Sequence, residues 1–331
     1  MPPYDPWRHR YTVVCACATA ILLVAGGLVT STGSGLAVPD WPLSFGGVFP
    51  PMEGGVLFEH GHRLVAATAG LLTLVLAVWF GRRETRTWVR RLAYAAIGTV
   101  VAQGILGGLT VLLRLPPLVS VLHACLAQGF FCLVVLLAVA TSKDFVRRQA
   151  PVRDGQAPPL RTLGAIATGL VFAQLIMGAV MRHTGAGLAI PDVPLAFGRL
   201  VPPLSSFAIG VHFAHRVMAI IVAGTVFCLS ARVLRGHHDR PGLRGPALLA
   251  SALVVLQILL GALTVLTRLA VVPATAHVVG GALLLATCLV LTIRAARAPS
   301  SREASRGEVS PGGRSEPVAP AAPARAAGSA A

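Results

Sequence analysis

Eight long apolar stretches run through this chain, and they restrict its possible folds more than any other feature. Each stretch is long enough to cross, as a helix, a hydrocarbon core of about 30 Å. Because lipid cannot hydrogen-bond to an open backbone, we expect these segments to be transmembrane helices. The sequence therefore predicts an all-α integral membrane protein with eight spans. The expected spans are residues 11–31, 62–80, 91–113, 118–141, 161–183, 208–234, 246–267 and 272–295.

Composition supports a membrane protein and argues against a nucleic-acid partner. Of the 331 residues, 55% are hydrophobic and only 12% are charged, too few for a soluble domain of this length. The net charge of +16 comes from short basic clusters between the apolar stretches, a pattern typical of cytoplasmic loops. We expect a multi-pass protein of a bacterial plasma membrane, because the ten residues before the first span leave no room for a mitochondrial transit peptide.

An internal repeat divides the chain into two copies of one unit. The segment TGSGLAVPDWPLSFG at Thr32–Gly46 returns as TGAGLAIPDVPLAFG at Thr184–Gly198, and QGILGGLTVLLRL at Gln103–Leu115 returns as QILLGALTVLTRL at Gln257–Leu269. The repeated segments are displaced by 152 to 154 residues. We therefore expect two tandem four-helix bundles of one topology, related by an axis roughly along the membrane normal.

The repeat sets the expected domain limits. Residues 1–150 form the N-terminal four-helix half, and residues 151–297 form the C-terminal four-helix half. Residues 298–331 are rich in Ala, Pro, Ser, Gly and Arg and lack the apolar content needed to pack, so we expect a disordered cytoplasmic tail. With eight spans and most basic residues inside, both termini lie in the cytoplasm.

Four histidines occupy equivalent positions in the two halves. His62 and His123 lie near the outer ends of the second and fourth spans, and His215 and His277 lie at the matching places in the second half. Ionisable side chains inside a span are costly and are usually functional. Two imidazoles from neighbouring helices are a common way to bind a haem iron axially within a bundle. We predict one haem site in each half, toward the outer face, with the two histidines of that half as axial ligands.

Two further histidines leave part of the assignment open. His60 lies close to His62 and offers another ligand in the first half. We favour His62 because an arginine follows it, as one follows His215. His183, at the outer end of the fifth span, has no clear role.

One acidic residue distinguishes the two halves. Glu59 stands three residues before His62, so both side chains can face one side of a helical turn, whereas the second half has His212 at the position of Glu59. A carboxylate beside only one pair of ligands indicates one reactive site and one supporting site. In an alternative interpretation, Glu59 interacts with the positive end of a helix dipole.

Arginines near the outer ends of the spans offer partners for haem propionates, since a buried cation needs an anion. Arg63 and Arg216, each next to a predicted ligand, are the first candidates, and Arg114 and Arg268 are the second. The alternative for all four is that the side chain extends to the membrane interface.

The combination of motifs resembles the haem A synthase family. The matching segments are GGLVTSTGSGLAVPDWPLSFG, EHGHR, QGILGGLTV and LHA, followed by a second, degenerate set. The resemblance covers roughly residues 11–295. It implies an enzyme, a haem-dependent membrane oxidoreductase that oxidises the C8 methyl of haem O to a formyl group. The implied route passes through a hydroxymethyl stage, and the product haem A serves terminal oxidases.

The resemblance also implies what each half binds. The first half would receive haem O as substrate, and the second would hold haem b as cofactor. The residues implied for haem b are His215, His277 and Arg216. Those implied for haem O are His62, His123 and Arg63, with Glu59 as the catalytic residue. A haem O synthase and an electron donor are implied as partners.

One departure from the family and one competing function remain. Many bacterial members carry a cysteine pair in the first outer loop, where this chain has Val38 and Ser44, so a loop disulfide cannot act here.

The competing function is that of a di-haem b-type membrane electron-transfer protein, which would not need Glu59. Such a protein would place its haems at different depths, whereas the four histidines share one side of the membrane. We therefore favour the synthase.

Overall fold

The computed structural model of the chain describes residues 4–146 and 156–296. Within these ranges it contains eight long helices, one short helix (α5) and one 3-10 helix (η1). The expected disordered tail, residues 298–331, lies outside the described residues. The bounds are α1 Pro6–Ser31, α2 Gly54–Arg83, α3 Thr87–Leu112, α4 Pro117–Thr141, α5 Lys143–Val146, α6 Leu160–His183, η1 Ala186–Leu188, α7 Phe207–Gly236, α8 Pro241–Leu266 and α9 Val271–Ala295.

The predicted all-α class with eight spans is confirmed. The eight long helices have 24 to 30 residues, and all are long and apolar enough to cross a membrane. All eight begin one to eight residues earlier than predicted, and α2 and α8 are two examples. Helix α2 begins at Gly54 instead of residue 62, and α8 begins at Pro241 instead of residue 246. An apolar stretch marks the part of a helix that faces lipid, and the helix itself continues into more polar surroundings at either end.

The early start of α8 places Pro246 inside a helix, where its missing N–H leaves one carbonyl without the usual partner. That carbonyl belongs to Gly242, four residues before the proline. Arg294 of α9 donates to it through Nη1 at 2.6 Å. A hydrogen bond from a neighbouring helix thus replaces the lost backbone bond and stabilises the first turns of α8.

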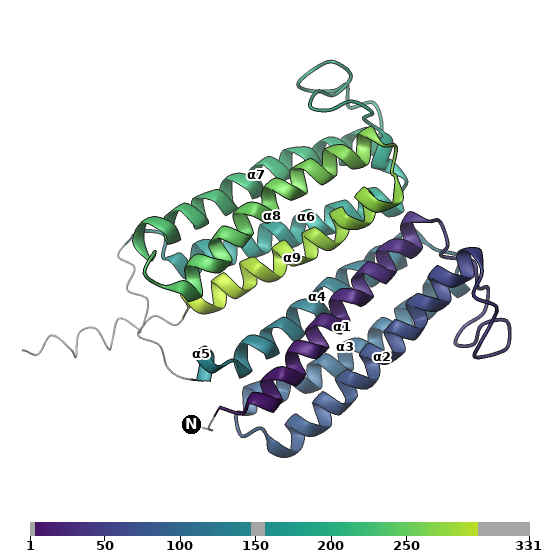
Figure 1. Cartoon of the computed structure of the whole chain (residues 1–331). Helices are drawn as coiled ribbons and strands as arrows, with labels where there is room; N and C mark the ends of the chain where they lie inside the picture. Colours follow the sequence, from purple (N-terminus) through teal and green to yellow (C-terminus); the bar gives the residue numbers. More distant parts are fainter. Residues whose placement is uncertain (1–3, 147–155, 297–331) are drawn as a thin grey trace, which may run out of the picture.

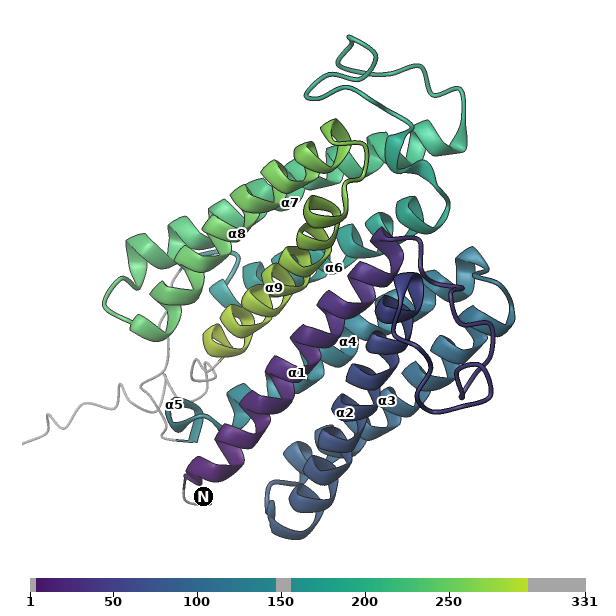
Figure 2. The ribbon, with the colours of Figure 1, turned by 45° about the vertical axis from the view of Figure 1, so that its right-hand side comes forward.

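The helices form two groups of four (Figures 1 and 2). In the first group α1 packs on α2, α2 on α3, α3 on α4, and α4 on α1. Helices α6 to α9 repeat this order in the second group. The two groups meet where α1 packs on α9 and where α4 packs on α6 and α9. Each pair of histidines predicted from the sequence therefore belongs to one group.

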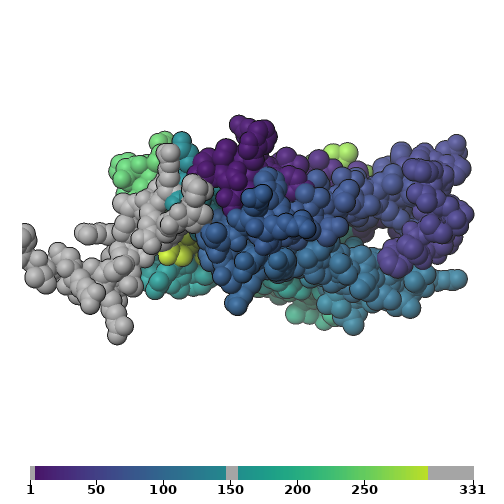
Figure 3. Space-filling model, turned by 90° about the horizontal axis from the view of Figure 1, so that it is seen from below, coloured from purple at the N-terminus to yellow at the C-terminus, as the bar shows by residue number. Residues whose placement is uncertain are grey.

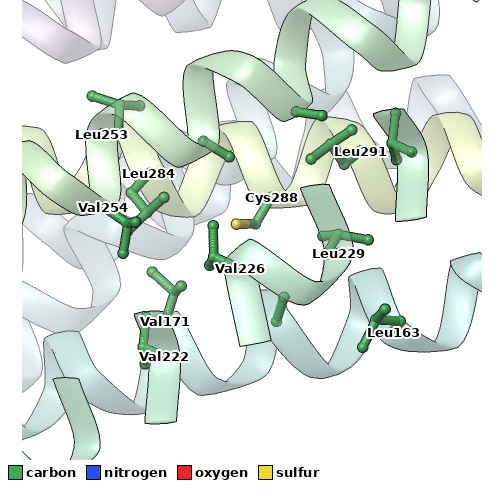
Figure 4. Packing of buried hydrophobic residues seen from close by; sticks show 14 of the residues in the cluster. Leu163, Val171, Val222, Val226, Leu229, Leu253, Val254, Leu284, Cys288 and Leu291 are labelled. Carbon is green, nitrogen blue, oxygen red and sulfur yellow. The ribbon is translucent and has the colours of Figure 1, made fainter. Parts of the chain in front are cut away.

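Aliphatic and aromatic side chains fill the interior of each group. In the second group, Val171 of α6, Val226 of α7, Val254 of α8 and Cys288 of α9 meet in one buried cluster (Figure 4). The corresponding cluster of the first group includes Phe80 and Phe130. Because lipid tails are as apolar as these side chains, close packing and interhelical hydrogen bonds, more than exclusion of water, hold such helices together.

Two long loops lie at the same end of the molecule, which we call the loop end. Loop 1 (residues 32–53) follows α1, and loop 2 (residues 184–206) follows α6 (Figures 1 and 2). In a space-filling view, loop 1 lies at one extreme of the elongated molecule (Figure 3). Each loop contains an isolated antiparallel bridge, Ser44 with Gly47 in loop 1 and Ala196 with Arg199 in loop 2. The repeated sequence therefore folds twice into the same turn.

An aspartate stabilises each of these turns. Asp40 accepts hydrogen bonds from the N–H groups of Phe45 (2.7 Å) and Gly46 (2.8 Å). Phe45 has a φ of 54°, in the left-handed region that costs a non-glycine residue roughly 1–2 kcal/mol, so the turn needs such support. Asp192 makes the equivalent pair of bonds in loop 2.

Candidate functional site

Each of the four predicted histidine ligands packs against a glycine of the preceding helix. A Cβ atom on Gly178 would lie 3.1 Å from Cε1 of His215, closer than a neighbouring atom normally tolerates. Glycine therefore lets the imidazole approach the backbone of the adjacent helix. The other pairs are Gly26 with His62 (3.1 Å), Gly107 with His123 (3.3 Å) and Gly261 with His277 (3.2 Å).

All four histidines lie at a similar depth below the loop end. Helices α2, α4, α7 and α9 begin at that end (Figure 1). His62 and His215 stand in the third turn of α2 and α7, and His123 and His277 stand in the second turn of α4 and α9. The two pairs are therefore side by side in the two groups and are not stacked across the membrane.

The imidazoles are also alike in having one nitrogen without a hydrogen-bond partner. In the described part of the chain, a buried Nδ1 lacks a partner in each of the four predicted ligands. Leaving a buried polar atom unpaired costs about 1–3 kcal/mol. The four rings therefore share one environment in the two groups.

In the second group the separation of the rings fits a single metal ion between them. The ring centroids of His215 and His277 are 6.5 Å apart, with the ring planes at 74°. An imidazole nitrogen binds a metal at about 2 Å, so two rings on opposite sides of one ion have centroids roughly 6 to 6.5 Å apart. Two axial ligands are what a haem iron requires, because the porphyrin supplies the other four. The residues present therefore fit a haem.

In the first group the rings of His62 and His60 meet different partners. The ring of His62 packs against Gly26 of α1, whereas Nδ1 of His60 is 2.8 Å from Oγ of Ser44 in loop 1. This hydrogen bond joins loop 1 to α2 at a position where the resemblance implied a cysteine that this chain lacks. His60 is thus engaged with loop 1, and His62 and His123 stay the predicted ligands of the first half.

Glu59 is buried between α2 and loop 1. Its Oε2 accepts a hydrogen bond from the N–H of Val38 (2.8 Å), and its Oε1 pairs with Arg63 (2.7 Å). In the second group His212 takes the same position, where its Nδ1 accepts from the N–H of Ile190 (3.3 Å). The carboxylate and the imidazole make equivalent contacts with the two loops, but only the first group places an acidic side chain there.

Arg63 and Arg216, predicted to bind propionates, donate to loop carbonyls in this structure. Nη1 of Arg63 lies 2.8 Å from the carbonyl oxygens of both Asp40 and Leu43. Arg216 donates to the carbonyls of Leu195 and Ile190. A role toward propionates stays a prediction for both residues. The alternative candidates, Arg114 and Arg268, are exposed residues at the ends of α3 and α8.

Two glutamines contact the ligands and were not predicted as site residues. Nε2 of Gln103 donates to the carbonyl of His123 at 2.9 Å, and Nε2 of Gln174 donates to the carbonyl of His215 at 3.0 Å. Gln103 belongs to a repeated motif, which was a signal for its position. Gln174 has no counterpart in the repeat, because the equivalent residue is Leu22.

Comparisons with known proteins give a family and several relatives. The sequence model of the COX15-CtaA family, described as cytochrome oxidase assembly protein, matches residues 53–289. A haem A synthase of Symbiobacterium thermophilum is 37% identical over 74% of this chain and 82% of its own length. Those of Shouchella clausii and Geobacillus kaustophilus are 32% and 31% identical, over 78% and 89% of this chain and 86% and 94% of their own lengths.

Proposed function

The chain belongs to the COX15-CtaA family of cytochrome oxidase assembly proteins and has haem A synthase function, converting haem O to haem A, and we propose how its two halves share this task. The second half holds a resident haem b through His215 and His277. The first half receives haem O through His62 and His123. This assignment rests on Glu59. Its carboxylate occupies the position that an imidazole occupies in the second half, so the two otherwise similar sites differ in their chemistry.

The separation of His215 and His277 supports the haem b assignment, since it fits two axial ligands of one iron. When bound, haem b supplies electron-transfer chemistry that protein side chains lack. The protein orients the ligands through Gly178 and Gly261, and Gln174 fixes the backbone beside His215. Similar contacts hold the histidines of the first half, so the proposed difference between the halves rests on Glu59 and His212.

In the first half we assign Glu59 a role in proton transfer. We propose that one of its carboxylate oxygens takes up a proton released as the methyl group of haem O is oxidised. Arg63 would hold the carboxylate in place, since the guanidinium pairs with Oε1 while the N–H of Val38 binds Oε2. The haem O synthase and electron donor implied by the family remain proposed partners.

The loop end is proposed to face outward from a bacterial plasma membrane. Basic residues in the first turns of α1 and in the last turns of α2 and α7 lie at the opposite end, as the distribution of arginine and lysine in membrane proteins predicts. Protease added to intact spheroplasts should therefore cleave loop 1, and cleavage only in inverted vesicles would contradict this orientation.

The sharpest test of the Glu59 role replaces it with the residue of the other half. Glu59→His keeps an acceptor for the N–H of Val38 but removes the carboxylate. We expect haem O to remain bound and haem A formation to fall by about 10²–10⁴-fold, the usual effect of losing a general acid or base. The reciprocal variant His212→Glu, which leaves the first half intact, serves as control and should still form haem A. Haem A formation at the wild-type rate in Glu59→His would refute the role.

A further inference from the structure

One face of α6 carries three residues that border the histidine pair of the second half. Gln174, Gly178 and Arg182 are spaced by four, so they lie above one another on one side of the helix. Gly178 contacts the ring of His215, and Gln174, one turn deeper, lies 3.3 Å from Nε2 of that ring. Arg182 stands one turn nearer the loop end. The site is therefore bounded by a polar residue on each side of the glycine.

The guanidinium of Arg182 is partly buried where both groups of helices meet. Its Nη2 donates to Oγ of Ser31 (2.7 Å) and to the carbonyl of Gly27 (3.2 Å), both on α1. Ser31 also accepts a hydrogen bond from Thr275, which stands two residues before His277 on α9. Ser31 therefore connects the guanidinium to a residue in the first turns of α9, close in sequence to His277.

Arg182 has binding capacity that the protein leaves unused. Of its three nitrogens, only Nη2 makes hydrogen bonds to the described residues. The four ion pairs recorded in that part of the chain involve Arg8, Arg63 and Arg86, and none involves Arg182. A cation within a membrane helix is costly unless an anion or several dipoles compensate its charge. A haem propionate would supply that anion.

The first half keeps the glycine of this face but neither polar neighbour. The residues equivalent to Gln174, Gly178 and Arg182 are Leu22, Gly26 and Thr30. Thr30 donates to the carbonyl of Gly26 on its own helix, and Leu22 has no polar group. The asymmetry matches the different needs of the two halves, since a cofactor must stay bound whereas a product must leave.

We propose that Gln174 and Arg182 are positioning residues that retain the resident haem of the second half. Arg182 binds a haem propionate, and Gln174 fixes His215. In the first half, Leu22 replaces Gln174 and Thr30 replaces Arg182, so the haem bound there is free to exchange. The inference rests on the proposed function, because it requires haem b in the second half.

The test uses Arg182→Gln in the full-length protein, purified from cells that make haem O. Glutamine keeps a polar side chain that can donate hydrogen bonds but lacks the charge. We expect haem b to pass to excess apomyoglobin roughly 10–100-fold faster, the usual cost of removing a residue that supports a bound group. The midpoint potential of haem b should also fall, because losing a nearby cation favours the ferric state. In the same variant, the haem O or haem A of the first half should be lost at the wild-type rate.

Arg199→Gln is the matched control, because Arg199 is an exposed arginine of loop 2 in the same half. Arg199→Gln should change neither the rate at which haem b passes to apomyoglobin nor the midpoint potential of haem b. If Arg182→Gln aggregates, Arg182→Lys decides, since lysine keeps the charge and should preserve the potential while releasing haem b faster. Wild-type rate and potential in the tested variant would overturn the inference and leave the proposed function standing. Absence of haem b from the wild-type protein would instead overturn the proposed function.

Discussion

At the scale of single residues, the glycines opposite the histidines decide how closely the helices approach the predicted iron ligands. A methyl group on Gly178 would lie 3.1 Å from Cε1 of His215 and would force the imidazole to move. Gly169 lies on the same helix with nothing within 4 Å of its Cβ position. This pair separates the effect of a methyl group beside the ring from the general effect of alanine on a helix.

We predict that Gly178→Ala lowers the amount of haem b per protein, because the displaced imidazole no longer lies opposite its partner ligand. Gly169→Ala should keep its haem and gain roughly 0.5–1 kcal/mol in stability, as alanine usually does in a helix. Haem content and thermal denaturation of both purified variants measure these effects. Equal haem content in the two variants would show that the glycine contact is incidental.

The sequence predicted the histidines and the special position of Glu59, because a repeat shows which residues differ between its copies. It did not reveal the glycine contacts, although Gly107 and Gly261 lie within the repeated QGILGG and QILLGA segments. A sequence pattern shows which face of a helix is apolar. It does not show which residue of a neighbouring helix meets a given side chain.

At the scale of elements, the first turns of α2 hold loop 1 in place. Glu59, His60 and Arg63 all bind atoms of the loop. The apolar pattern predicted a later start for α2, because these polar residues interrupt it. Their side chains are satisfied by the loop backbone, a long-range contact that periodicity cannot predict. The same interaction explains why Arg63 and Arg216 donate to loop carbonyls in this structure.

Arg63→Ala should destabilise the protein more than Arg216→Ala. Arg63 pairs with the carboxylate of Glu59 as well as with loop carbonyls, whereas the hydrogen bonds of Arg216 go to carbonyls alone. Leaving a buried carboxylate unpaired costs more than losing neutral partners, so we expect about 2–4 kcal/mol for Arg63→Ala and about 1–2 kcal/mol for Arg216→Ala. Thermal denaturation in detergent measures both, and the reverse order would contradict this account.

The turns of both loops should loosen in acid. The N–H of Gly46, and next that of Phe45, lower the pKa of Asp40 from its ordinary value of 3.8, and Gly198 and Phe197 do the same for Asp192. A carboxyl whose pKa is lower in the folded state stabilises the fold above the unfolded value and loses this effect as pH falls through the folded value. Hydrogen-exchange protection of the turns should therefore decrease below about pH 3.8.

Asp40→Asn provides the control for the acid effect, because asparagine does not titrate. This variant should show weaker protection in the turn of loop 1 at neutral pH and little further change in acid. Unchanged protection of the wild-type turns down to pH 2 would mean that the aspartates do not hold them.

At the scale of the whole molecule, both histidine pairs lie at one depth, and one ligand of each pair, His123 of α4 and His277 of α9, stands on a helix where the two groups of helices join. Arg182 of the second group reaches Ser31 of the first, so the connection between groups passes beside the ligands. The repeat predicted two similar units, but it carried no information on which helices would face each other. Shared depth suits two haems that exchange electrons sideways within one half of the membrane, and it does not suit transfer across the membrane.

The most direct test of one cofactor site and one substrate site is pigment analysis of the wild-type protein. The chain would be purified from cells that also express a haem O synthase, and its haems extracted, separated by chromatography and counted per protein. We predict haem b together with haem O or haem A, at no more than one of each kind per chain. Two molecules of haem b per chain, despite abundant haem O, would contradict the account and favour a di-haem electron-transfer protein.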